Sequence, residues 1–306
     1  MTRVLFRLSL AIAWLFVAAD KSAADSMLFG GIGFGSPQNR GALIAVDPAT
    51  GSGTVVGPGA GPNAGLTGLT FDAAGALWGS TSTNPIVTDP AVGAPQLLQL
   101  DPLTGTPIFS APLTFGGNVL EINDLAADPL SGILFGVSLN INDTSIYTID
   151  KDTGNASLIG ATGVLGVTLA FAPDGTLYMT SATFDMSGQT GSFLHTVDPL
   201  TGNPTSTTPI GLLPSGNFVH FGGLAVDPAD GTIYGSAREA TAAQKGDIFT
   251  LTPGGVATRV GSTGAGEPGD LTFQPIPEPA SLTLLGLGLA GIGARRWRQR
   301  KTPRRE

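Results

Sequence analysis

The sequence predicts an all-β protein, a β-propeller of five four-stranded blades. Two short units that each read as β-strands and turns recur through the chain, and they alternate. The segments between them lack the 3.6-residue spacing of apolar side chains that marks amphipathic helices. The 306 residues include 45 Gly and 23 Pro but only 12% charged residues, which is typical of a globular chain rich in turns.

The first unit is an apolar strand that ends at Asp and is followed by a Gly turn. Its five copies read LIAVDPATG, LLQLDPLTG, IYTIDKDTG, LHTVDPLTG and a degenerate IFTLTPGG, with Asp47, Asp101, Asp150, Asp198 and Thr252 at the matching position. The copies recur at intervals of about 50 residues, as blades of a propeller do. Asp forms such turns by accepting hydrogen bonds from the backbone two residues further on, so we expect these residues to be structural and not calcium ligands.

The second unit is a hairpin that lies between copies of the first. It reads GLTFDAAGALWGSTS, DLAADPLSGILFGVS, TLAFAPDGTLYMTSA and GLAVDPADGTIYGSA. Gly75, Gly132, Gly175 and Gly231 close the turns, and an aromatic residue follows in each returning strand: Trp78, Phe135, Tyr178 and Tyr234. The hairpin supplies the inner two strands of a blade, and the first unit supplies the third strand and leads into the fourth.

The first and last strands of the body are each unpaired within their own repeat. A lone strand spans Met27 to Gly35, and a lone inner strand spans Asp270 to Pro275. Pairing of these two strands would complete the first blade and leave no free sheet edge. We therefore expect a closed five-bladed ring, with a pair of β-sandwiches as the alternative fold.

The two ends of the chain carry targeting signals. Residues 1–24 contain Arg3 and Arg7, an apolar run and small residues, the order found in a signal peptide whose apolar part is helical. Residues 25–276 form the propeller. Residues 277–306 begin with Pro277, Glu278 and Pro279 and continue through an uncharged run at about 280–294, which we expect to be a transmembrane helix. A basic tail that includes Arg295, Arg296 and Arg298 follows it.

This C-terminal segment, PEPASLTLLGLGLAGIGARRWRQRK, resembles the PEP-CTERM sorting signal. The resemblance implies that an exosortase recognises Pro277, Glu278 and Pro279, while Arg295, Arg296 and Arg298 hold the anchor in place. It also implies an inner-membrane-anchored precursor that is released to the cell surface or extracellular matrix of a Gram-negative bacterium. It concerns location only, because such tails follow many unrelated domains.

The net charge of the propeller residues excludes nucleic acids as partners. Residues 25–276 hold 20 acidic and 5 basic residues, a net charge of −15. Such a field repels nucleic acids. The absence of cysteine excludes disulfides, thiolate catalysis and thiolate-bound zinc.

The candidate site lies where the chain enters each inner strand. The positions there are Gly68, Asp124, Thr168, Gly223 and Asp270, and Glu121, His220 and Glu267 lie a few residues before three of them. Glu121, Asp124, His220, Glu267 and Asp270 could together hold a cation such as calcium or the hydroxyl groups of a sugar. The same pattern is also typical of a solvated acidic rim.

The inner hairpin LAFAPDGTLYMTS is similar to the repeat of surface propellers of the NHL and YVTN groups, which supports the fold and leaves the ligand open. We expect a non-catalytic binding or structural module of the envelope or exopolysaccharide matrix. Its partners would be polysaccharide or a surface protein, and no cofactor is required. Two alternatives remain: a glycan-cleaving hydrolase that uses carboxylates at the channel, and an adhesion module stabilised by a cation.

Overall fold

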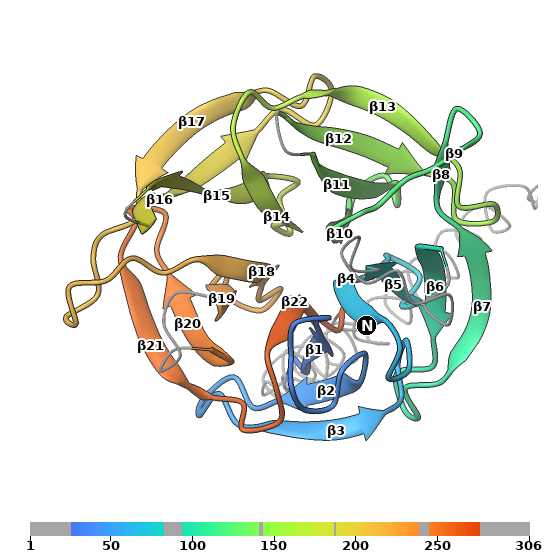
Figure 1. Ribbon diagram of the computed structural model, residues 1–306, viewed down its shortest axis with the longest axis horizontal. Coiled ribbons are helices and arrows are strands. Elements are labelled where there is room, and N and C mark those ends of the chain that lie inside the picture. Colours follow the sequence, from blue (N-terminus) through green and yellow to red (C-terminus); the bar gives the residue numbers. More distant parts are fainter. Residues whose placement is uncertain (1–25, 83–93, 141–142, 187, 239–244, 276–306) are drawn as a thin grey trace, which may run out of the picture. The chain divides into compact units, whose positions relative to one another are not determined.

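The computed structural model describes residues 26–82, 94–140, 143–186, 188–238 and 245–275. These residues form five four-stranded antiparallel sheets arranged as a ring (Figure 1). The five-bladed propeller predicted from the repeats is therefore confirmed. The predicted signal peptide, the apolar segment at 280–294 and the sorting-signal residues Pro277, Glu278, Pro279, Arg295, Arg296 and Arg298 lie outside the described residues.

The strands of each blade follow one another from the innermost, at the channel, to the outermost. Blade 1 consists of β22 (Pro268–Phe273), β1 (Leu28–Ile32), β2 (Leu43–Val46) and β3 (Gly53–Gly57). Blade 2 consists of β4 (Gly65–Phe71), β5 (Leu77–Ser82), β6 (Gln96–Leu100) and β7 (Pro107–Pro112). Blade 3 consists of β10 (Asp124–Ala127), β11 (Leu134–Asn140), β12 (Asp143–Ile149) and β13 (Ala156–Ala161).

The last two blades have the same order. Blade 4 consists of β14 (Gly166–Phe171), β15 (Leu177–Asp185), β16 (Gly188–Val197) and β17 (Pro204–Pro209). Blade 5 consists of β18 (Phe221–Val226), β19 (Ile233–Ala237), β20 (Asp247–Leu251) and β21 (Ala257–Ser262). A short hairpin that the sequence did not reveal, β8 (Thr114–Phe115) and β9 (Asn118–Val119), lies in the connection from blade 2 to blade 3.

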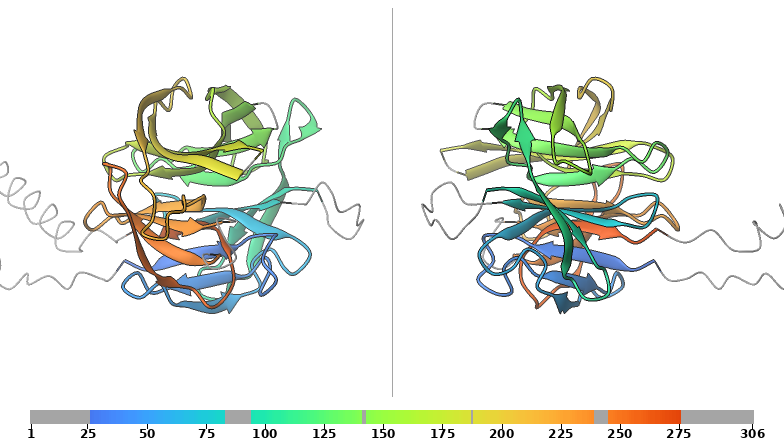
Figure 2. Two further views of the ribbon diagram at one scale, coloured as in Figure 1. Left: turned by 60° about the vertical axis from the view of Figure 1, so that its left-hand side comes forward. Right: turned by 90° about the vertical axis from the view of Figure 1, so that its right-hand side faces the viewer.

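The ring closes as expected, by pairing of its first and last strands. β1 and β22 are antiparallel neighbours, with Leu28 opposite Phe273 and Gly30 opposite Leu271 (Figures 1 and 2). The pairing covers the edges that both strands would otherwise expose. Closure therefore depends on contacts between residues almost a whole chain length apart.

The hydrophobic core lies between neighbouring blades. Five clusters of buried side chains each join two adjacent sheets, for example Leu43 of blade 1 with Leu69 of blade 2. The inner strands face a neighbouring blade on both sides, so β4 and β18 are buried along their whole length. In the part of the chain that the structure describes, no helix is long and apolar enough to cross a bilayer.

The turn glycines of the first repeat unit pack against the preceding blade around the ring. Gly105 has a φ of 65°, and a methyl group at its Cα would lie 2.8 Å from the Cα of Gly57 in blade 1. Gly51 and Gly202 meet Gly261 and Gly160 in the same way, while Gly154 and Gly255 lie against the carbonyls of Pro112 and Pro209. The glycine of this turn is thus needed twice, for its backbone angle and for the contact between blades.

Candidate functional site

A pocket opens at the channel mouth, which we define as the end of the ring where the inner strands begin. Its volume is about 470 Å³. It draws residues from blades 1, 2, 3 and 5: Gly33, Phe34, Gly35, Ser36, Thr67, Ser82, Glu121, Asn123, Arg238, Lys245, Glu267, Pro268 and Gly269. The sequence predicts the candidate site at this end of the inner strands, and the structure places a polar pocket there.

Two of the predicted site residues, Glu121 and Glu267, line this mouth pocket. Ser82 donates a hydrogen bond from Oγ to Oε1 of Glu121. Lys245 Nζ lies 3.7 Å from Oε1 of Glu267. Arg238 adds a second positive charge to the lining, so the pocket combines two carboxylates with two cations.

Asp124 and Asp270 are both completely buried, at 0% exposure. The amides of Leu125 and Leu169 donate to Asp124, at 2.6 and 2.8 Å. The amides of Leu271 and Leu69 donate to Asp270, at 2.6 and 2.5 Å. Each aspartate therefore ties its own inner strand to the inner strand of the next blade: Asp270 joins blade 1 to blade 2, and Asp124 joins blade 3 to blade 4.

The two aspartate side chains are also hydrogen-bonded to each other. Burial raises the pKa of Asp124 to about 8, although the bond from Asp270 and the amides of Leu169 and Leu125 oppose this rise. Burial and the neighbouring Asp124 raise the pKa of Asp270 well above its usual value. A hydrogen bond between two carboxyl groups requires a proton, so the two aspartates share one.

Small residues at the matching positions of other blades make room for this pair. Gly223 of β18 is one of them, because a methyl group there would lie 2.9 Å from Oδ1 of Asp270. Gly68 of β4 lies close to the amide nitrogen of Leu125 in the same manner, with 2.8 Å to a methyl group. Thr168 of β14 bonds within its own blade to Thr180, at 2.7 Å between hydroxyl oxygens. The channel is thus narrow enough for two aspartates to meet across it.

His220, the remaining predicted site residue, is not among the residues that line the mouth pocket. Its ring lies edge-on against Phe184, with centroids 5.5 Å apart, and its carbonyl accepts a hydrogen bond from the amide of Arg238. The structure therefore brings Glu121 and Glu267 to one pocket and Asp124 and Asp270 to one buried pair, and it places His220 elsewhere.

The aspartates of the DPxTG turns form turns, as predicted. In the first of these turns, Asp47 accepts from the amide of Ala49 at 2.9 Å and from the hydroxyl of Thr50 at 2.6 Å. These bonds lower the pKa of Asp47, because they stabilise the carboxylate. Asp101, Asp150 and Asp198 repeat the arrangement. Among the described residues, no group of three or more His, Asp or Glu side chains is placed to share a metal ion.

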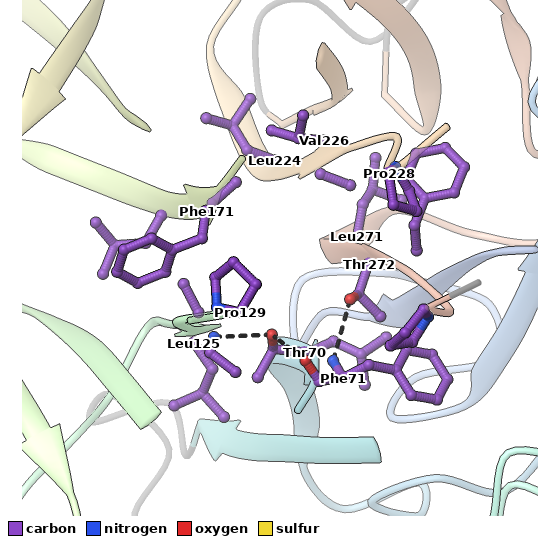
Figure 3. A pocket seen from close by; sticks show the side chains of 18 of the residues that line it. Thr70, Phe71, Leu125, Pro129, Phe171, Leu224, Val226, Pro228, Leu271 and Thr272 are labelled. Atoms are coloured by element: carbon purple, nitrogen blue, oxygen red, sulfur yellow. Dashed lines mark hydrogen bonds between the residues drawn. The ribbon is translucent and has the colours of Figure 1, made fainter. Parts of the chain in front are cut away.

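A second pocket lies at the channel base, where the inner strands end, and the repeat pattern did not predict it. Its volume is about 140 Å³. Its lining is largely apolar and includes Leu125, Phe171, Leu224, Val226 and Leu271 (Figure 3). Figure 3 also shows Thr70 and Thr272, whose hydroxyls accept bonds from Ala127 N and Phe71 N of neighbouring blades.

The mouth residues in the loops between the second and third strands of a blade were not predicted either. Phe34 and Ser36 lie in the Gly-rich segment between β1 and β2, and Arg238 and Lys245 lie between β19 and β20. Ser36 Oγ accepts from the amide of Glu267 at 3.2 Å, and Arg40 lies over the Phe34 ring at 4.5 Å. These loops differ in sequence between blades, so comparing the repeats does not identify their residues. Their position between the second and third strands was the signal that could have found them.

Comparison with known proteins identifies the C-terminal tail. Residues 275–299 match the PEP-CTERM protein-sorting motif, which confirms the resemblance seen in the sequence. No curated protein matches the chain. A chain in the crystal structure of a nidogen/laminin complex is 12% identical, with 82% of this chain and 98% of that chain covered and a TM-score of 0.48. A protein of unknown function from Bacteroides caccae is 11% identical, with coverages of 83% and 99% and a TM-score of 0.47.

Proposed function

We propose that this five-bladed propeller, whose PEP-CTERM motif implies an exported, membrane-anchored precursor, is a non-catalytic binding module of the cell surface or extracellular matrix. Its ligand would bind in the mouth pocket. The motif implies processing by an exosortase in general, which would separate the propeller from its membrane anchor.

The observation that carries this proposal is the mouth pocket itself. Its volume of about 470 Å³ falls within the range of roughly 300–1,000 Å³ that is usual for ligand sites. Connections within blades 1 and 5 and connections between blades both contribute to its lining, whereas the opposite end of the ring carries short, tightly bonded turns such as the one at Asp101. Binding residues in proteins lie preferentially on loops that a rigid scaffold positions.

The chemistry of the pocket favours a neutral, hydroxyl-rich ligand such as a segment of extracellular polysaccharide. Glu121 and Glu267 can accept hydrogen bonds from hydroxyl groups, and Arg238 and Lys245 can donate to them. The two charges of each sign balance within the lining, while the net charge of −15 on residues 25–276 opposes a polyanionic ligand. A surface protein remains the other class of partner.

The buried aspartates support binding over catalysis. A glycosidase needs two carboxyl groups that flank the scissile bond with space for the sugar between them. Asp124 and Asp270 are instead hydrogen-bonded to each other at 0% exposure, and each accepts hydrogen bonds from two backbone amides. Their position suits a role in holding the blades together.

A hydrolase is the second candidate function, because Glu121 and Glu267 line the same pocket. One experiment separates the two functions. The full-length chain is incubated with a panel of bacterial polysaccharides, and both retention on the polysaccharide and release of reducing ends are measured. Binding without reducing ends supports the proposal, whereas reducing ends that disappear in Glu121→Gln and Glu267→Gln would establish the hydrolase instead.

The same variants test the position of the site. We expect Glu121→Gln and Glu267→Gln each to weaken polysaccharide binding about tenfold, because a neutral amide oxygen accepts a weaker hydrogen bond from a hydroxyl group than a carboxylate does. Asp101→Asn, a change in a turn at the opposite end of the ring, is the matched control and should leave binding unchanged. Equal binding by all three variants would remove the mouth pocket from consideration.

The cation-stabilised adhesion module makes a different prediction. If it is correct, calcium should raise the melting temperature of the full-length chain, and a chelator should reverse the rise. A binding module of the kind proposed should instead bind polysaccharide equally well with calcium and with chelator.

The location is tested by removing residues 277–306. We expect the intact chain to appear first in the membrane fraction and then at the cell surface or in the matrix. The truncated chain should lose the membrane-bound stage. Recovery of the intact chain from the cytosol would contradict the proposal.

A further inference from the structure

The geometry of the buried aspartates points to a proton-dependent latch: we propose that the Asp124–Asp270 hydrogen bond holds the closing strand β22 in the ring only while the pair shares a proton. The proposal concerns the stability of the closed ring and is independent of the ligand at the mouth pocket.

The pair is the centre of a continuous run of hydrogen bonds that crosses four of the five blades. Leu69 of blade 2 donates to Asp270 of blade 1, at 2.5 Å. Asp270 bonds to Asp124 of blade 3, which accepts from Leu169 of blade 4 at 2.8 Å. Because Asp270 belongs to β22, this run attaches the last strand of the ring to blades with which it shares no sheet.

Among the described residues, the immediate surroundings of the pair provide no positive charge that could replace the proton. The neighbours on the other inner strands are Gly68, Thr168 and Gly223, which carry no charge. The residues paired with the aspartates in their own sheets, Val137 and Gly31, carry none either. The charged side chains toward the channel mouth are Glu121, Glu267, Lys245 and Arg238; Ser82 bonds to Glu121, and Lys245 pairs with Glu267.

Loss of the proton would leave two carboxylates in contact at 0% exposure. Like charges repel strongly where water is excluded, so the ionised pair would separate or draw water into the channel. Either response breaks the bond between the side chains of blades 1 and 3. β22 would then depend on its pairing with β1 and its contacts with blades 2 and 5.

The direction of the pH effect follows from the raised pKa of both groups. The folded chain keeps a proton that the unfolded chain releases above the ordinary aspartate pKa of 3.8. The stability from the latch is therefore fully present below pH 3.8 and is lost as pH rises through the raised pKa values of the folded pair. One retained proton changes the unfolding equilibrium constant about tenfold for each pH unit within this range.

The strand that carries Asp270 lies directly before the sorting motif in the sequence. β22 ends at Phe273, and the PEP-CTERM motif begins at residue 275. Loosening of β22 would release the residues that directly precede the sorting motif, among them Gln274, whose amide donates to the carbonyl of Met27 at 2.9 Å.

The test compares the full-length chain with Asp270→Asn by urea unfolding at about pH 5, 6, 7 and 8. Asn donates to Asp124 at every pH, so its bond cannot be lost by ionisation. Asn can also accept a hydrogen bond from one backbone amide fewer than Asp can, and this loss should lower the stability by the same factor at each pH. We expect the unfolding constant of the wild type, divided by that of the variant, to rise about tenfold per pH unit. Asp101→Asn, in an exposed turn, should show a constant ratio.

A ratio of wild type to Asp270→Asn that does not change with pH would overturn the latch. If Asp270→Asn does not fold, Asp124→Asn serves in the same measurement. Infrared spectroscopy of the wild type is the independent measurement: a buried protonated carboxyl group should be present at about pH 6, and its signal should weaken as pH rises through the raised pKa values of the pair. If the wild type shows no signal from a protonated carboxyl group at about pH 6, the proposal is wrong.

Discussion

Lys151 Nζ lies 2.9 Å from Oδ2 of Asp72 and joins the outer turn of blade 3 to the inner turn of blade 2. Lys151 occupies the position that Pro48, Pro102 and Pro199 occupy in the other DPxTG turns. The same Asp72 oxygen accepts from Trp78 Nε1 at 3.0 Å, and the other oxygen accepts from the amides of Ala74 and Ala76. A departure from the repeat therefore adds an ion pair to the contacts between these two blades.

Removal of Lys151 should destabilise the ring modestly. The lysine side chain is 33% exposed and that of Asp72 only 5%, so water screens the pair on one side. We expect Lys151→Met to cost about 1 kcal/mol of unfolding free energy. Asp72→Ala should cost more, about 2–4 kcal/mol, because it also leaves Trp78 Nε1 and two amides without their acceptor. Urea unfolding measures both, and an equal loss in the two variants would contradict this account.

The same pair determines part of the acid sensitivity of the protein. Burial opposes ionisation of Asp72, but the bonds from Lys151, Trp78 and Ala76 outweigh it and lower its pKa. The stability from this group is present above the ordinary pKa of 3.8 and is lost as pH falls through the lower folded value. We expect Asp72→Asn to flatten the pH dependence of the melting temperature below about pH 4, whereas Lys151→Met should flatten it only in part.

The contact between neighbouring blades can be tested with two matched glycine substitutions. Gly105 and Gly75 both have positive φ, 65° and 80°, but only Gly105 lies against a neighbouring blade. Gly75→Ala should cost about 1 kcal/mol for the backbone strain alone. Gly105→Ala should cost about 3 kcal/mol or more, because Gly57 must also move. Similar losses of unfolding free energy for the two variants in urea unfolding would show that the turn, and not the contact between blades, requires glycine at position 105.

Buried His195 should affect stability in the opposite direction to the latch, because its protonation destabilises the fold as pH falls. Its ring nitrogens bond to the hydroxyls of Ser181 at 2.7 Å and Thr207 at 2.9 Å, and burial lowers its pKa. The stability from neutral His195 is present above the ordinary pKa of 6.5 and is lost as pH falls through the lower folded value. We expect the melting temperature of His195→Gln, relative to that of the wild type, to rise as pH falls from 6.5 to about 5. NMR titration of the ring, with an apparent pKa at or above 6.5, would contradict this prediction.

The turn aspartates should contribute without any metal ion. Asp101→Ala removes the bonds to Leu103 N and Thr104 Oγ1, which we expect to lower the melting temperature slightly. The decrease should be the same in calcium and in chelator. A decrease that occurs only with calcium present would show that Asp101 binds the ion.

The fold could be predicted from the sequence because both repeat units consist of local signals. Alternating apolar residues, Asp at the start of a turn and Gly at its end specify a hairpin through neighbours in the chain, and five copies specify a ring. The lone strands near Leu28 and Leu271 then had one remaining place to pair, which the register of β1 and β22 confirms. The PEP-CTERM motif could be recognised for the same reason, since all of its parts are contiguous.

The site depended on distances that the sequence does not contain. The repeat placed Asp124 and Asp270 at equivalent positions, but whether they face water or each other depends on the width of the channel, which Gly68 and Gly223 help to set. Lys151 and Asp72 are brought together by the angle between two blades, and Arg238 reaches the mouth pocket on a loop that differs from the other blades. The sequence by itself determined the strands, the ring and the sorting signal; the packing of separate blades decided which charges meet and which are buried.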